Sequence, residues 1–212
     1  MDVRAFTVGP FQENTFVLRA DGSDRALLID PGDEAELLSE ALEKLGVTVE
    51  AILITHTDVD HVGAVAAMAK ATGAPVYCPK LEVERLQDIM GHVPIEGIGP
   101  YEGYDPEQTV EGGEELELAG LKIEVVATPG HTEGHVTYAF PDERVIASGD
   151  VLFQGSVGRT DRPNGDHQAL LRSIATLLER YPDDTLVLPG HMGTTTLGRE
   201  KETNPVLAEL AR

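Results

Sequence analysis

The sequence predicts an α/β protein made of two similar halves whose β-sheets pack face to face. Short apolar runs alternate with segments of helical periodicity in both halves of the 212-residue chain. No linker or low-complexity stretch divides the chain, so we expect one domain over residues 1–212. Four of the apolar runs end in small residues that are followed by a histidine or an aspartate, which predicts metal ligands at the ends of strands.

The first half is expected to begin with strands and then to alternate strand and helix. The apolar residues between 37 and 45 recur at helical spacing, and Gly46 marks the end of that helix. An Ala-rich helix is expected over residues 62–71, before Gly73. The expected strands of this half lie near residues 5–8, 15–19, 26–30 and 51–55.

The second half follows a segment, residues 90–113, that is rich in Gly and Pro and lacks periodicity. We interpret this segment as a lid over the site, although a passive surface loop is equally compatible with its composition. A helix is expected over residues 168–181, and a short helix near 205–211 is expected to close the chain. The expected strands of this half lie near residues 115–118, 121–127, 136–140, 145–148 and 185–188.

The chain is strongly acidic, with 16 Lys+Arg residues against 37 Asp+Glu residues and a formal net charge of -21. This charge repels nucleic acids and anionic membranes, so neither is an expected partner, and we interpret the acidity as favouring solubility. The N-terminus has no apolar signal core and no apolar stretch approaches membrane-spanning length, so we expect a cytoplasmic protein. Cys78 is the single cysteine, which excludes an intrachain disulfide and a thiolate-rich zinc site. We interpret its side chain as a small apolar group that fills space in the core.

The densest group of candidate ligands lies within residues 56–61, where two imidazoles and two carboxylates follow an apolar run and precede a helix. Zinc, iron and manganese accept this mixture of donors, and a strand-to-helix loop holds such donors on a rigid scaffold. Ligands from separate strand ends meet only if those ends lie on one rim of the sheets. His135 is expected to support His131 rather than to bind metal. The candidate ligands are His56, Asp58, Asp60, His61, His131, Asp150 and His191.

The motif THTDVDH at residues 55–61 resembles the T-H-x-H-x-D-H signature of the metallo-β-lactamase superfamily. Further motifs over nearly the whole chain are similar to those of its glyoxalase II-like hydrolases. These motifs are residues 9–15, 29–32 (IDPG), 128–135 (TPGHTEGH), 148–150 (SGD), 155–161 and 189–191 (PGH). The resemblance implies a four-layer αββα sandwich of two packed mixed sheets flanked by helices. It is specific for the superfamily and weaker for the substrate, because this fold carries several chemistries.

The resemblance also implies a centre of two divalent metal ions. The implied ligands are His56, Asp58 and His131 for one ion and Asp60, His61 and His191 for the other, with Asp150 bridging both. Asp60 and Asp150 are then the catalytic residues, and Asp60 orients a metal-bound hydroxide or takes its proton.

One position departs from the family pattern, because Asp58 stands where the family usually has a second histidine. A carboxylate is a harder donor than an imidazole, so direct ligation by Asp58 favours iron or manganese over zinc. The flavin-dependent diiron branch of the superfamily resembles this chain in having a carboxylate there. Alternatively, Asp58 hydrogen-bonds a ligand histidine from behind, and we rank direct ligation ahead of that arrangement.

The implied activity is hydrolysis of an acyl thioester, such as S-lactoylglutathione or a related small thiol conjugate, by a metal-bound hydroxide. The alternative is a mononuclear iron oxidoreductase like the persulfide dioxygenases, because His56, His131 and Asp150 alone form the two-histidine, one-carboxylate set that suits non-haem iron. His61 and His191 favour a second metal and oppose this alternative. A binding protein that lost catalysis through Asp58 is a third hypothesis, and the sequence makes no prediction of the oligomeric state.

Overall fold

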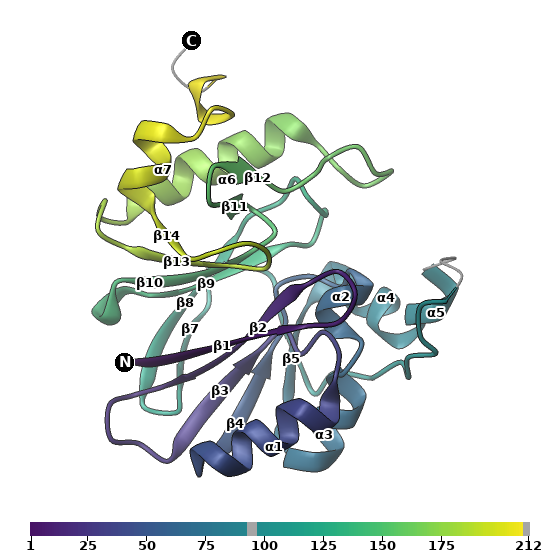
Figure 1. The fold of residues 1–212 in the computed structure, drawn as a ribbon. Coiled ribbons are helices and arrows are strands. Elements are labelled where there is room, and N and C mark those ends of the chain that lie inside the picture. The colour runs from purple at the N-terminus through teal and green to yellow at the C-terminus, as the bar shows by residue number, and fades with distance from the viewer. Residues whose placement is uncertain (93–96, 210–212) are drawn as a thin grey trace. The chain divides into compact units, whose positions relative to one another are not determined.

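In the computed structural model, which describes residues 1–92 and 97–209, the chain forms two compact units. The N-terminal unit comprises Met1–Val110 and Glu117–Leu121, and the C-terminal unit comprises Glu111–Leu116 and the chain from Lys122 onward. The chain carries two six-stranded mixed sheets, each flanked by helices (Figure 1). The prediction of an α/β fold with two mixed sheets is therefore confirmed, whereas the single-domain assignment stays a prediction.

The sheet of the N-terminal unit has the strand order β1-β2-β3-β4-β5-β6. Its strands are β1 (Asp2–Val8), β2 (Glu13–Arg19), β3 (Arg25–Ile29), β4 (Thr48–Leu53), β5 (Val76–Pro79) and β6 (Gln108–Val110). The first three strands are antiparallel, and β3 to β6 run parallel. Parallel strands end at the same edge of a sheet, so the residues that follow β3 and β4 are brought together there.

Helices cover this sheet and bury an apolar face against it. They are α1 (Ala35–Leu45), α2 (Val59–Val62), α3 (Val65–Thr72), the 3-10 turn η1 (Lys80–Glu82), α4 (Val83–Gln87) and α5 (Ile89–His92). Leu38 of α1 and Met68 of α3 belong to one buried cluster with Leu28 and Ile52 of the strands, which removes their apolar surface from water. Cys78 lies in the same cluster, and burial raises the pKa of its thiol, as expected of a structural filler.

The helix expected over residues 62–71 is α3, which begins three residues later than expected, and a separate short helix, α2, precedes it with a break at Gly63 and Ala64. The backbone N–H of Ala64 donates to the carbonyl of Pro31 at 3.0 Å, outside either helix. The break therefore reflects a tertiary contact between α2 and the loop after β3, which the Ala-rich sequence does not encode locally.

Within the segment 90–113, the described residues up to Val110 belong to the N-terminal unit, whereas Glu111 to Gly113 belong to the C-terminal unit. The Tyr101 hydroxyl donates to Asp33 at 2.7 Å, Lys70 pairs with Glu102 at 2.9 Å, and residues 108–110 form β6, which the sequence analysis did not predict. Residues 93–96 lie outside the described residues. The lid role stays a prediction, and the contacts of Tyr101 and Glu102 are made within the N-terminal unit.

The second sheet has the strand order β14-β13-β10-β9-β8-β7. Its strands are β7 (Glu115–Leu118), β8 (Leu121–Ala127), β9 (Val136–Phe140), β10 (Val145–Gly149), β13 (Leu186–Pro189) and β14 (Thr195–Thr196). A hairpin of β11 (Leu152–Phe153) and β12 (Ser156–Val157) stands apart from it. Strands β10 and β13 are parallel neighbours, so Asp150 and His191 follow strands that end at the same edge.

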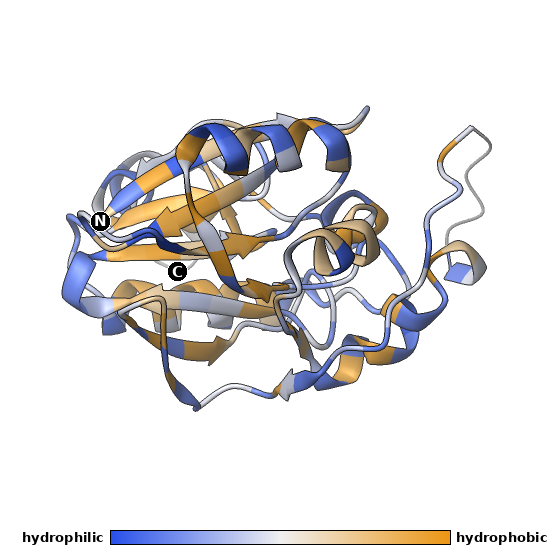
Figure 2. Cartoon of the chain, turned by 90° about the horizontal axis from the view of Figure 1, so that it is seen from below, coloured by the Kyte–Doolittle hydropathy of each residue, from blue (hydrophilic) through white to orange (hydrophobic). Residues whose placement is uncertain are grey.

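The helices of the C-terminal unit are α6 (His167–Arg180) and α7 (Leu197–Thr203), with 3-10 turns η2 (Pro141–Glu143) and η3 (Leu207–Glu209). Leu170 and Ile174 of α6 share a buried cluster with Ile146 and Val187 of the strands. In Figure 2 the strands are mostly in the hydrophobic colour, whereas the helices carry both hydrophobic and hydrophilic colours. Among the described residues, no helix is both long and apolar enough to cross a membrane.

Within residues 205–211, where a short helix was expected, the described residues form the 3-10 turn η3, and the helix that precedes it, α7, was not predicted. Helix α7 follows a Thr196 cap that accepts from the Arg199 N–H at 3.2 Å, and it ends at Thr203, with Asn204 as its C-cap before Pro205. A proline has no N–H to continue a helix, and it disfavours helical backbone at the residue before it. Only the turn η3 follows among the described residues, and 210–212 lie outside them.

Candidate metal centre

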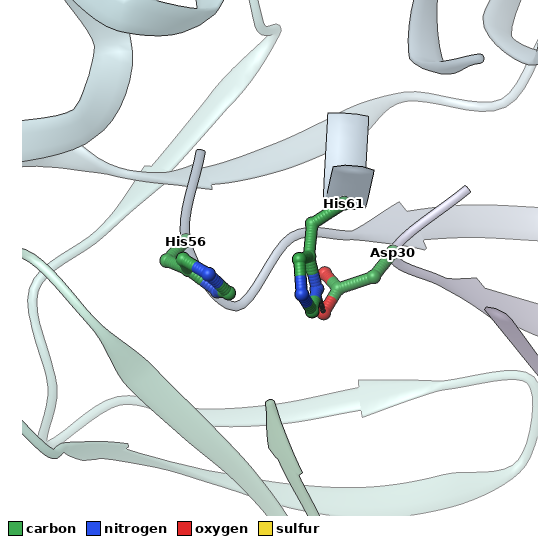
Figure 3. Close-up of side chains that lie close together, drawn as sticks. All are labelled: Asp30, His56 and His61. Atoms are coloured by element: carbon green, nitrogen blue, oxygen red, sulfur yellow. Dashed lines mark hydrogen bonds and ion pairs between the residues drawn. The ribbon is translucent and has the colours of Figure 1, made fainter. Parts of the chain in front are cut away.

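In the N-terminal unit, three buried side chains gather at the carboxyl ends of the parallel strands. Asp30 follows β3, His56 follows β4 and His61 lies in α2 (Figure 3). Each offers a donor atom, and the three atoms lie within 4.8 Å of one another. The His56 and His61 ring centroids are 4.1 Å apart, with the two rings tilted by 52°.

The hydrogen bonds of this group fix which nitrogen of each ring carries hydrogen. An ionised Asp30 carboxylate only accepts, so the Thr55 hydroxyl donates to it at 2.6 Å and His61 donates to it from Nδ1 at 3.0 Å. Because the single Thr55 hydroxyl hydrogen is used on Asp30, His56 Nδ1 at 3.0 Å must donate to Thr55 Oγ1. Both neutral rings are then in the tautomer with hydrogen on Nδ1, which leaves a lone pair on Nε2 that can bind a metal ion.

Asp58 turns its two carboxylate oxygens to different neighbours. Its Oδ2 lies 3.9 Å from Nε2 of His56, and its Oδ1 lies 3.3 Å from Nη2 of Arg85. The Nδ1 side of the His56 ring, from which a carboxylate would support a ligand histidine, is bonded to Thr55 instead. Asp58 is therefore on the metal-binding side of His56, and it is buried.

Asp60 is on the first turn of α2, and its Oδ2 lies 4.0 Å from Nε2 of His61. The loop after β3 approaches it closely, because a Cβ on Gly32 would lie 1.8 Å from the Asp60 carbonyl oxygen. Only glycine fits there. Gly32 thus allows the two loops that carry Asp30 and Asp60 to pack against each other.

Glu13 of β2 is a buried acidic neighbour that the sequence analysis did not identify as part of the site. Its Oε1 lies 3.8 Å from His61 Nδ1, and it accepts a hydrogen bond from Thr15 at 3.1 Å. Burial raises the pKa of Glu13 well above its usual range, His61 opposes this rise, and Asp30 adds to it. Glu13 and Asp30 both fall within the family motifs at 9–15 and 29–32, a signal that the sequence analysis noted without assigning either residue to the site.

In the C-terminal unit, Asp150 lies between two histidines. Its Oδ2 is 3.6 Å from Nε2 of His131 and 3.6 Å from Nε2 of His191. His131 donates from Nδ1 to the Arg159 carbonyl at 2.8 Å, so its neutral ring also carries the lone pair on Nε2. His191 stands edge to face against Phe153 with ring centroids 5.8 Å apart. One carboxylate between two imidazoles is the arrangement expected of a ligand shared by two metal ions.

His135 uses both of its nitrogens on the protein. Its Nε2 accepts the Asp150 backbone N–H at 3.1 Å, so its Nδ1 donates to Thr128 at 3.0 Å. These two hydrogen bonds hold Thr128 and the backbone of Asp150 rather than the ring of His131, so the expected support of His131 stays a prediction. The Arg159 guanidinium donates to the Asp161 carboxylate at 2.7 and 2.8 Å in the loop that follows Asp150.

Both units thus collect their predicted ligands into local groups built on strand ends. Buried histidines with Nε2 lone pairs beside carboxylates fit divalent zinc, iron or manganese. The tight glycine contact recurs in the C-terminal unit, where a Cβ on Gly158 would lie 1.8 Å from the Asp150 carbonyl oxygen.

The family model and the curated relatives that match this chain agree on one protein family. Residues 8–191 match the Metallo-beta-lactamase superfamily. The chain is 35% identical to "Hydroxyacylglutathione hydrolase GloC" of Haemophilus influenzae, over 98% of each protein. It is 37% identical to "Probable metallo-hydrolase YqgX" of Bacillus subtilis, again over 98% of each.

Three solved structures with the same fold are similar to this chain in sequence. "BLEG-1 B3 metallo-beta-lactamase" is 38% identical with a TM-score of 0.91, over 97% of this chain and 99% of that one. TTHA1623 "in a di-iron-bound form" is 39% identical with a TM-score of 0.86, over 95% of this chain and 98% of that one. ETHE1 from Myxococcus xanthus is 28% identical with a TM-score of 0.77, over 98% of this chain and 85% of that one.

Proposed function

The chain belongs to the metallo-beta-lactamase superfamily, and from this premise we propose that it is a binuclear metal-dependent hydrolase of small acyl thioesters. The observation that carries the binuclear part is the position of Asp150 Oδ2, 3.6 Å from Nε2 of both His131 and His191. The similarity to a hydroxyacylglutathione hydrolase over almost the whole chain supports a thioester of a small thiol conjugate, such as S-lactoylglutathione.

We assign the ligands by the family pattern and by the donor chemistry of each unit. The proposed sets are His56, Asp58 and His131 for one ion and Asp60, His61 and His191 for the other, with Asp150 shared. The harder oxygen donor at Asp58 supports iron or manganese ahead of zinc. The di-iron form of TTHA1623, which is 39% identical, is compatible with that choice.

The protein side chains contribute positioning and proton transfer. Divalent ions held by these residues would supply Lewis acidity and would lower the pKa of a bound water to roughly 7. Asp60, whose side chain is 16% exposed, orients the attacking water and holds its proton. The leaving thiolate needs little acid assistance, because a free thiol has a pKa near ~8.5.

The second candidate is a mononuclear iron oxidoreductase that uses His56, His131 and Asp150. The observation in its favour is the Asp58–Arg85 ion pair at 3.3 Å, because a carboxylate engaged in this way is able to stay outside a three-ligand site. Asp60, His61 and His191 would then have no metal to bind, and we rank this candidate second.

A substrate panel tests the proposed function. Purified, metal-loaded protein is assayed with S-lactoylglutathione for thiol release, with a cephalosporin for lactam opening and with glutathione persulfide for oxygen uptake. Thiol release that depends on protein and metal, at a higher kcat/KM than lactam opening, is the expected result. Oxygen uptake without thioester cleavage would establish the second candidate, and lactam opening alone would refute the thioester assignment.

A further inference from the structure

Arg85 contacts the loop that carries the proposed ligands (residues 56–61), but it has no role in the family motif or in the proposed mechanism. It lies in α4, and its Nη2 is 3.3 Å from Oδ1 of Asp58. The Asp58 side chain is 5% exposed and that of Arg85 is 24% exposed, so most of this pair is shielded from water. A largely buried carboxylate paired with a guanidinium is held in position much more firmly than one on the surface.

The stretch from Glu82 to Arg85 contacts two consecutive residues of the loop 56–61, Thr57 and Asp58. The Thr57 hydroxyl donates to the buried Glu82 carboxylate at 2.6 Å, and the Thr57 N–H donates to it at 3.3 Å. Arg85 contacts Asp58, the next residue in the loop. Because Glu82 and Arg85 are three residues apart across η1 and α4, this stretch fixes both the backbone of the loop and the direction of the Asp58 carboxylate.

Asp58 is not used to cap the helix that it precedes. It is the N-cap residue of α2, where aspartate is usually favoured because its side chain accepts a backbone N–H, but its side chain makes no such bond. Its two oxygens are directed instead at Arg85 and at the Nε2 side of His56. The carboxylate is therefore committed to the ion pair on one side and to the metal-binding group on the other.

We infer that Asp58 and Arg85 act as one unit that replaces the usual histidine ligand. Arg85 is a positioning residue: it holds Oδ1, so that Asp58 offers a single oxygen, Oδ2, to a metal. Its positive charge also offsets that of the carboxylate, so the pair matches a neutral histidine in charge and in number of donor atoms. What remains different is the hard oxygen donor. This inference rests on the proposed metal centre and explains how a carboxylate is tolerated at that position.

The inference predicts that the effects of the two residues on metal binding are coupled. In Asp58→His protein, Arg85 faces a neutral ring, and its uncompensated charge repels a metal ion. Arg85→Met should then raise zinc affinity by about tenfold in that background. In the wild-type background the same substitution removes repulsion but also releases Asp58, so zinc affinity should change by less than about threefold. Affinities are measured on metal-free protein by competition with a chromophoric chelator.

Cobalt absorption gives a second readout, independent of activity. A released Asp58 is able to bind through both oxygens, and the visible absorption of Co(II) weakens as its coordination number rises. Arg85→Met should therefore weaken the Co(II) spectrum, whereas Arg85→Lys, which keeps the charge, should preserve it. Arg19→Met is the matched control, because Arg19 is 26% exposed and pairs with Asp2 at 2.9 Å in the same unit. It should leave both readouts unchanged.

Two results would overturn the inference, and they are distinguishable from failure of the proposed function. Equal effects of Arg85→Met in both backgrounds, or a Co(II) spectrum unchanged by it in folded protein, would show that Arg85 does not position Asp58, while the metal centre would stand. If the wild-type protein bound neither zinc nor Co(II), the metal centre and the inference would both fail.

Discussion

Replacing Asp30 by asparagine should weaken metal binding without removing any proposed ligand. Asp30 has a left-handed backbone with φ of 47°, which asparagine tolerates, so the substitution keeps shape and backbone and removes only the charge. The Oδ1 atom accepts the Thr55 N–H at 2.7 Å, and so the asparagine oxygen must stay at that position. The new NH2 group then faces the Thr55 hydroxyl and His61 Nδ1.

Reversing these hydrogen bonds changes the tautomer of both His61 and His56. His61 Nδ1 must accept from the NH2 group, which moves its hydrogen to Nε2. The Thr55 hydroxyl accepts as well and is free to donate to His56 Nδ1, so that ring also moves its hydrogen to Nε2. Loss of such supporting groups costs 10–100-fold in metal affinity, which is about 1.4–2.7 kcal/mol.

The assay is chelator competition on the metal-free protein, with thermal melting to verify the fold. Asp33→Asn is the matched control, because Asp33 accepts a hydrogen bond from Tyr101 at 2.7 Å but not from a proposed ligand. We expect the control to bind metal like the wild type. Unchanged metal affinity in folded Asp30→Asn protein would refute the tautomer argument, since the reversed hydrogen bonds are its direct consequence.

Three further predictions concern other parts of the chain. Asp150→Ala should lose metal and thioester turnover together, and turnover retained with full metal content would rule out a bridging role. Gly32→Ala places a Cβ 1.8 Å from the Asp60 carbonyl, so denaturant unfolding should report a loss of about 1–3 kcal/mol or more, and an unchanged midpoint would contradict the contact. The Arg159 hydrogen bond lowers the pKa of Asp161 from 3.8 to about 2, so the stabilisation is present above pH 3.8 and is lost as the pH falls toward 2. In Arg159→Met protein an NMR titration should return this pKa toward 3.8, and an unmoved midpoint would exclude the ion pair as its cause.

Most strands of the two sheets were predictable because they carry local signals, whereas β5, β6 and β14 were not expected. The strands from β8 to β10, for example, are apolar runs with turn residues between them, and all were expected close to their observed bounds. The elements that were missed depend on distant partners. The short strand β14 is only two residues long, and it is defined by its pairing with β13 rather than by any periodicity of its own.

The same distinction applies to the site. The candidate ligands were found from sequence because each follows a strand or lies in the dense motif at 55–61. The residues that support them were assigned no role, because their contacts span long stretches of chain: Asp30 acts on His61 across 31 residues and Arg85 acts on Asp58 across 27. Such pairs become visible only when the fold brings the segments together.

The central claim is a binuclear centre, and the metal content of the protein tests it most directly. Elemental mass spectrometry on protein purified without chelator or added metal gives both the identity and the number of metal ions per chain. We predict about two ions per chain, with iron or manganese ahead of zinc because of the oxygen donor at Asp58. A single iron per chain would contradict the binuclear centre and favour the mononuclear oxidoreductase, and no metal even after reconstitution would contradict both.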